Sequence, residues 1–149
     1  MRLQNDRYEF IKAKVVNMFK KYNINSIPVD CFEICKKMFI EVKPYSKLGA
    51  IGLEKAMSVS SDGFCMMHPM RICSIKVDSW YIFYNDSMLK ERIRFTIMHE
   101  IGHIVLDHSE HSELAEAEAN FFAKYALAPP HLFIKYRLMT MLTLLFPLK

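Results

Sequence analysis

Two histidines four residues apart, with a glutamate directly after the first, are the clearest chemical feature of this 149-residue sequence. They are His99, Glu100 and His103. On a helix, this spacing places both imidazoles on one side, one turn apart, where they can bind one Zn²⁺. Glu100 would then lie near a water on that metal and act as its general base. The pattern therefore predicts metal-assisted hydrolysis of an amide bond.

A catalytic zinc site also needs a third protein ligand and an open position for water. One class of zinc peptidases supplies glycine three residues and histidine six residues after the second metal-binding histidine. Leu106 and Ser109 occupy those positions here and exclude that class, and His108 falls one residue short. The third ligand must come from further along the chain, where the next predicted helix offers Glu113, Glu116 and Glu118.

Glu116 is the candidate we favour as the third ligand. It lies four residues before Asn120, so the two share a helix face, and the amide could hold a ligating histidine by its other nitrogen. Glu118 is the competitor, and it lies about 200° around the helix from Glu116, so both cannot face one metal. Glu113 is better explained as an acid that complements the helix dipole in the first turn.

Three more side chains could contact a substrate. Tyr81 and Tyr84 carry hydroxyl groups that could donate to a developing oxyanion. His108 could orient the site or bind the metal in place of Glu116. For all three, packing or a structural role is the alternative interpretation.

These residues need helices to position them, and the sequence predicts several. Isoleucines recur at helical spacing around the His-Glu pair, after capping side chains at Asn85, Asp86 and Ser87. Capping residues, apolar periodicity and prolines predict helices at 6–22, 30–37, 85–106 and 112–127.

The remaining segments are rich in residues that favour strands. These predict strands at 39–44, 64–67, 71–77 and 80–84, with turns at Gly49, Gly52 and Gly63 and a tight turn at Asp78–Ser79. The expected fold is α+β, with a small, mainly antiparallel sheet of about three strands packed against the active-site helix and its neighbours.

Composition excludes several other classes of protein. The net charge is +4, from 20 basic and 16 acidic residues without a long basic run, so we do not expect direct nucleic-acid binding. The charged, amphipathic N-terminus does not match a signal peptide. The four cysteines form no C-x-x-C pair, which favours reduced thiols in a cytoplasmic protein over a second zinc site.

The C-terminal segment 131–149 is atypical because it contains no acidic residue and is strongly apolar from 138 to 148. Spanning a bilayer takes about 20 apolar residues, so this segment is too short to be a membrane span. We expect a last core helix, or a helix that meets a partner chain. The length of the chain suits one domain, residues 1–149, with this tail at its end.

The sequence around both site helices resembles the ImmA/IrrE family of metallo-endopeptidases. Ile82 to Asn85, leading into the helix that ends at His103, is similar to the family's strand and active-site helix. The run E-A-E-A-N-F-F-A at 116–123, followed by Leu127-Ala128-Pro129, resembles its second signature. The resemblance covers roughly residues 6–130. It implies a zincin-like fold, a gluzincin-like site of two histidines and a glutamate, and one zinc ion per chain.

The resemblance also implies a substrate. Many relatives are encoded in phages and other mobile elements, where they act as anti-repressors by cleaving a helix-turn-helix transcriptional repressor. The expected function is a cytoplasmic zinc endopeptidase that cleaves such a repressor. The alternative is a regulatory module that keeps the fold and docks to a repressor without proteolysis, although such a module would not need Glu100. The apolar tail departs from the family pattern.

Overall fold

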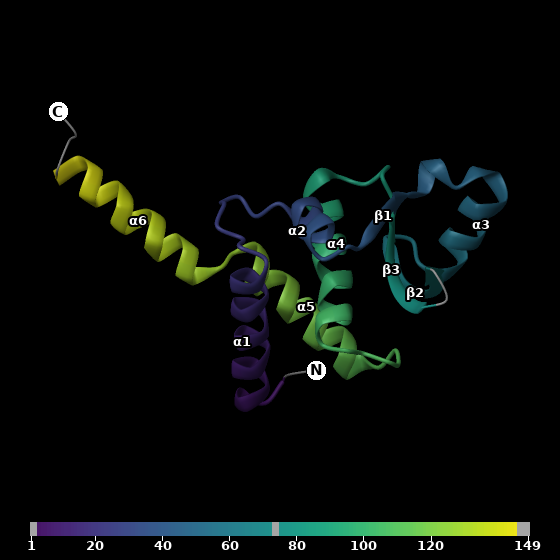
Figure 1. The fold of residues 1–149 in the computed structure, drawn as a ribbon, viewed down its shortest axis with the longest axis horizontal. Helices are drawn as coiled ribbons and strands as arrows, with labels where there is room; N and C mark the ends of the chain where they lie inside the picture. The colour runs from purple at the N-terminus through teal and green to yellow at the C-terminus, as the bar shows by residue number, and fades with distance from the viewer. Residues whose placement is uncertain (1–2, 73–74, 146–149) are drawn as a thin grey trace.

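The protein is described here by a computed structural model that covers residues 3–72 and 75–145. Its fold is α+β, as the sequence predicts, with α4 near the centre, α1 and α5 on one side of it and the sheet on the other (Figure 1). The helices are α1 (Asn5–Lys21), α2 (Cys31–Lys37), η1 (Tyr45–Lys47), α3 (Gly49–Val59), α4 (Lys90–Val105), α5 (Glu113–Leu127) and α6 (Pro130–Leu145). The strands are β1 (Glu41–Pro44), β2 (Gly63–Ile72) and β3 (Ile75–Tyr84).

The sheet has three strands in the order β1-β3-β2 and is mixed. The long pair β2 and β3 is antiparallel, as expected, with Gly63 opposite Tyr84. The short strand β1 instead runs parallel to β3, with Glu41 opposite Tyr81, because α3 and β2 lie between them in the chain and carry it back across the sheet. Strand β2 therefore forms one edge of the sheet.

Three local predictions in this region are wrong. The predicted strand 71–77 is divided between the end of β2 and the start of β3, and its residues 73–74 lie outside the described residues. Gly49 and Gly52 belong to α3 rather than to turns between strands, because the segment is otherwise rich in helix formers such as Ala, Leu, Lys and Met. Asp78 and Ser79 lie inside β3 and pair with Pro69 and His68, so ladder pairing overrides their preference for turns.

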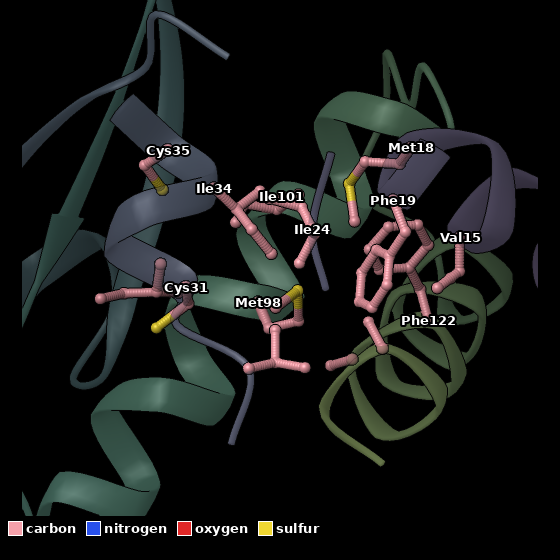
Figure 2. Close-up of a cluster of buried hydrophobic side chains, with 14 of the residues drawn as sticks. Val15, Met18, Phe19, Ile24, Cys31, Ile34, Cys35, Met98, Ile101 and Phe122 are labelled. Carbon is pink, nitrogen blue, oxygen red and sulfur yellow. The ribbon is translucent and has the colours of Figure 1, made fainter. Parts of the chain in front are cut away.

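The hydrophobic core lies between α1, α2, α4 and α5 (Figure 2). Val15 of α1, Ile34 of α2, Ile101 of α4 and Phe122 of α5 are completely buried in it. Apolar side chains of this size contribute about 1.5–3 kcal/mol each when they leave water. This shared core holds α4 and α5 against each other, and with them the site residues that each helix carries.

Side-chain caps begin two of the helices at the predicted places. Asp30 accepts hydrogen bonds from the backbone amides of Phe32 and Glu33 at the start of α2. Ser112 accepts one from the amide of Ala115 at the start of α5. Helix α4 begins later than predicted, at Lys90, because the Asn85 side chain bonds the carbonyl of Ser61 and the Ser87 amide and hydroxyl instead of capping the helix.

The C-terminal segment forms α6, which extends away from the other helices (Figure 1). Leu132 is buried in the core, whereas Phe133, Ile134 and Leu138 are exposed. Among the described side chains, the tail thus joins the core only through its first turn. Within the described residues, no helix combines the length and the apolar character that a membrane span requires.

Candidate active site

Helices α4 and α5 bring three predicted ligands together. The Nε2 atoms of His99 and His103 lie 3.0 Å apart on one side of α4. One carboxylate oxygen of Glu116, from the first turn of α5, is 3.3 Å from Nε2 of His99, and the other is 3.4 Å from Nε2 of His103. The three side chains converge on one point, as the sequence predicts for a metal site.

The donor set of this cluster fits a tetrahedral metal ion. Two imidazole nitrogens and a carboxylate are a set of ligands that catalytic zinc sites use. Donors at about 2.1 Å from a tetrahedral ion lie about 3.4 Å from one another, close to the separations observed between these atoms. All three ligand atoms lie within 4.8 Å of one another. The cluster can therefore hold one metal ion and leave a fourth position open.

The cluster opens into a cleft of about 570 Å³ between α3, β2, α4 and α5. Glu100 lines the same cleft as the three candidate ligands. Glu116 is about half exposed in it, while His99 and His103 are largely buried. A substrate in this cleft could reach the metal position and Glu100 at the same time.

Glu100 is a buried carboxylate held by the edge strand. Its side chain is 7% exposed, and one oxygen accepts a hydrogen bond of 2.9 Å from the backbone amide of Cys65 in β2. Burial raises the pKa of Glu100 to about 7, although its hydrogen bonds with Cys65 oppose the shift. A carboxyl group with this pKa can both accept and release a proton near neutral pH, as a general base must.

The contact between β2 and Glu100 depends on the close approach of β2 to α4. A Cβ atom on Gly63, at the start of β2, would lie 2.7 Å from both the carbonyl oxygen of Phe83 and a methyl carbon of Thr96 in α4. Only glycine fits between the neighbouring strand and the helix. Gly63 therefore lets β2 lie where the Cys65 amide can reach Glu100.

Both histidines of the cluster are held in the neutral form that a metal requires. Burial, with a smaller contribution from the neighbouring His99, lowers the pKa of His103 to about 4. Burial also lowers the pKa of His99, against the opposing effects of Glu116 and the Asn120 side chain. Asn120 thus interacts with His99, but the Nδ1 atom of His99 is buried and has no hydrogen-bond partner among the described residues.

Glu118, the competing ligand, faces another part of the molecule. Its carboxylate is 3% exposed and accepts hydrogen bonds from Arg7 of α1, at 2.5 and 2.7 Å. The second partner is Nε2 of His108, at 3.0 Å. The Arg7 hydrogen bonds are the main reason that the pKa of Glu118 is lowered. Because these partners occupy the Glu118 carboxylate, Glu116 is the acid of α5 that reaches the two histidines.

The two tyrosines lie outside the cleft lining. Tyr81 stacks on Phe83, with ring centroids 6.3 Å apart, and Lys43 lies over its ring. Tyr84 meets Phe32 edge-on and lines a separate hollow beside α2. Neither position supports the predicted contact with an oxyanion. His108 does adjoin the site, because its Nδ1 atom is 2.9 Å from Nδ1 of His103.

The structure adds residues that the sequence does not single out for this site. His111, in the loop before α5, lines the cleft and has a nitrogen 3.7 Å from Glu116. Arg92 and Asp62 form an ion pair in the cleft lining. No spacing rule connects Arg92 or Arg7 with the site, since their partners lie far away in the sequence. For His111 the sequence does offer a signal, because this histidine lies five residues before the candidate ligand Glu116.

A small α+β fold with a His-Glu-x-x-His helix beside an acid-bearing helix is the arrangement of a zincin-like peptidase. The chain matches the model of one family, the IrrE N-terminal-like domain (Peptidase_M78), over residues 51–145. It therefore belongs to this peptidase family, which confirms the resemblance found in the sequence. The match runs from α3 to α6 and includes both helices of the candidate site. No curated protein and no solved structure matches the chain.

Proposed function

We propose that this protein is a zinc-dependent endopeptidase with one zinc ion per chain. His99, His103 and Glu116 would hold the ion, and Glu100 would act as general base. The observation that carries the proposal is the convergence of the three ligand groups in a single cleft that the buried carboxylate of Glu100 also lines. Membership of a peptidase family supports the same reaction.

Each residue of the site would have a separate role in amide hydrolysis. A zinc ion supplies a Lewis acid that activates water at neutral pH and polarises the substrate carbonyl. The Glu100 carboxylate takes a proton from the attacking water and then delivers it to the nitrogen of the leaving amine. The Cys65 amide donates to one oxygen of Glu100 and so fixes the orientation of this carboxylate in the cleft. The side chain of Asn120 interacts with the imidazole of His99 and would help to orient it.

For the substrate, we propose a helix-turn-helix repressor, and for the location the cytoplasm. Both rest on the resemblance to relatives that release a mobile element from repression by cleaving its repressor. Phe64 and Phe95 are among the side chains that line the cleft, and their rings offer apolar surface to side chains of a protein substrate. No direct contact with nucleic acid is part of the proposal, since the modest net charge of +4 offers no basis for one.

Glu100→Gln separates catalysis from metal binding. We expect the variant to keep about one zinc per chain by elemental analysis, because Gln fills the same space and removes no ligand. Cleavage of a purified helix-turn-helix repressor encoded beside this gene should fall by about 10²–10⁴-fold, the usual contribution of a general base. Removing zinc with a chelator should abolish cleavage in the wild type, and adding zinc back should restore it.

The matched control is Glu33→Gln, which removes a carboxylate that pairs with Lys37 on the surface of α2. It should leave both metal content and cleavage unchanged. A wild-type protein that holds zinc but cleaves neither the repressor nor an unbiased peptide library would contradict the proposal. If Glu100→Gln still relieved repression in cells, the chain would act by docking and not by proteolysis.

A further inference from the structure

Four side chains form a continuous hydrogen-bonded row from helix α1 to the candidate metal position. Arg7 of α1 contacts Glu118 of α5, and Glu118 contacts Nε2 of His108 in the loop between α4 and α5. The Nδ1 atom of His108 then lies 2.9 Å from Nδ1 of His103. Arg7 and Glu118 are 111 residues apart in the sequence, so only the tertiary fold assembles this row.

The direction of each hydrogen bond follows from the end of the row at Arg7. Guanidinium nitrogens only donate, and Arg7 donates to both oxygens of Glu118, at 2.5 and 2.7 Å. A carboxylate bound by both nitrogens of a guanidinium is ionised and accepts only. The Nε2 atom of His108, 3.0 Å from the same carboxylate, must therefore donate.

The proton on Nε2 of His108 decides which of the two Nδ1 atoms, that of His108 or that of His103, carries a proton. When His108 is neutral it carries a single ring proton, so a proton on Nε2 leaves Nδ1 bare and able to accept. Its partner is Nδ1 of His103, which must then carry the proton. The Nε2 atom of His103 is left with a free lone pair, and this is the atom that faces His99 and Glu116 at the metal position.

We propose that Arg7, Glu118 and His108 are positioning residues that keep His103 in the one tautomer able to bind metal through Nε2. The proposal rests on the metal site of the proposed function. In this proposal Glu118 orients the ligand His103 through His108, whereas Glu116 binds the metal itself. The N-terminal helix α1 becomes part of the site through Arg7, although α1 contributes no group to the cleft.

The burial of Glu118 and His108 and the surroundings of His99 support this role, while Arg7, at the outer end of the row, is 38% exposed. The side chains of Glu118 and His108 are 3% and 10% exposed, so water competes little for their hydrogen bonds. His99 differs at the matching nitrogen: its Nδ1 atom has no hydrogen-bond partner among the described residues, and Asn120 is a polar side chain that acts on its ring. The row thus fixes one of the two histidines before any metal arrives, which lowers the cost of assembling the site.

The tautomer of His103 can be measured directly in the metal-free wild-type protein. In protein labelled with ¹⁵N-histidine, two-bond ¹H–¹⁵N correlation spectra distinguish a protonated ring nitrogen from a bare one. We expect His103 to show a protonated Nδ1 and a bare Nε2, and His108 to show the reverse. A His103 with its proton on Nε2 would overturn the proposal, and this measurement needs no variant and no substrate.

Substitutions test whether the row matters for metal binding. Glu118→Gln should weaken zinc affinity by about 10- to 100-fold, as loss of outer partners of metal ligands commonly does. His108→Asn keeps an oxygen near the position of Nδ1 that can accept from His103, whereas His108→Leu cannot accept. We therefore expect His108→Asn to retain more zinc affinity than His108→Leu in competition with a chelator.

Glu9→Gln is the matched control, since it removes a carboxylate of α1 that pairs with Lys12 on the surface. It should leave zinc affinity and the His103 tautomer unchanged. Equal zinc affinities for Glu118→Gln, the control and the wild type would refute the positioning role. These readouts do not involve cleavage, so they stand apart from the test of the peptidase. A protein with the expected tautomer and zinc affinity that cleaves nothing would contradict only the proposed function.

Discussion

Gly102, inside the His-Glu-x-x-His motif, packs directly against Phe122 of α5. A Cβ atom there would lie 3.1–3.2 Å from three atoms of Phe122, a side chain that is completely buried. Glycine costs about 1 kcal/mol of helix propensity relative to alanine, so its presence in mid-helix needs a reason. The reason is the short distance between the two helices, which brings Glu116 within reach of the histidines.

Gly102→Ala should therefore destabilise the protein even though alanine favours helix. Overpacking a buried position costs about 1–3 kcal/mol, and the middle of this range, about 2 kcal/mol, exceeds the helix gain of about 1 kcal/mol. We expect a net loss of about 1 kcal/mol in the free energy of unfolding, measured by urea denaturation. A shift of α5 away from α4 should also weaken zinc affinity.

The double variant Gly102→Ala with Phe122→Leu provides the control, because the smaller side chain makes room for the new methyl group. The cost of Gly102→Ala should be smaller in the Phe122→Leu background than in the wild type. A stabilising effect of Gly102→Ala alone would show that Phe122 can move away and that the close contact is not needed.

Among the elements, α5 supplies the third candidate ligand, Glu116, together with Glu118 and Asn120. Its start is set by Ser112, whose hydroxyl accepts a hydrogen bond of 3.1 Å from the amide of Ala115. Glu116 follows in the first turn, where a frayed helix end would displace it. The cap is therefore coupled to the geometry of the metal site.

Ser112→Ala should lower the free energy of unfolding by about 1 kcal/mol, the usual cost of losing such a cap. It should also reduce zinc affinity, because the first turn of α5 holds Glu116 less firmly. Urea denaturation and chelator competition measure the two effects. Ser112→Asp retains a capping oxygen and should restore stability, and a Ser112→Asp variant as unstable as Ser112→Ala would contradict the capping role.

For the whole molecule, the buried thiols of α2 make stability depend on pH. Burial raises the pKa of Cys31 to about 11 and that of Cys35 to about 12, from 9.0 in each case. In the unfolded chain both thiols ionise near pH 9, while in the folded protein they stay protonated. Folding stability from this source is complete below pH 9 and is lost as the pH rises toward 12.

We expect the free energy of unfolding to fall by at least about 2 kcal/mol between pH 9 and pH 11, as each pKa unit is worth about 1.4 kcal/mol. Urea denaturation at several pH values measures the slope. The double variant Cys31→Ala with Cys35→Ala should be less stable overall, yet its stability should fall less steeply over the same pH range. Equal slopes for the two proteins would exclude the thiols as the cause.

Much of the fold could be predicted because local patterns and local structure agree. Apolar periodicity and caps predicted α1, α2 and α5 to within about one residue, and the β2 and β3 segments carried strand formers. The predictions that failed concern segments whose conformation is set by pairing between strands that are distant in the sequence. The parallel pairing of β1 and the strand conformation of Asp78 and Ser79 depend on partners that no local pattern identifies.

By itself, the sequence predicted the two histidines, Glu100 and Glu116 as residues of one site, since helical spacing alone places these groups on defined faces. Only the tertiary structure decided what surrounds them. It brought Cys65 to Glu100, turned Glu118 toward Arg7 and His108, and placed Tyr81 and Tyr84 outside the cleft. The physical reason is that the helical repeat fixes directions within one element, whereas hydrogen bonds between elements depend on how the core packs them together.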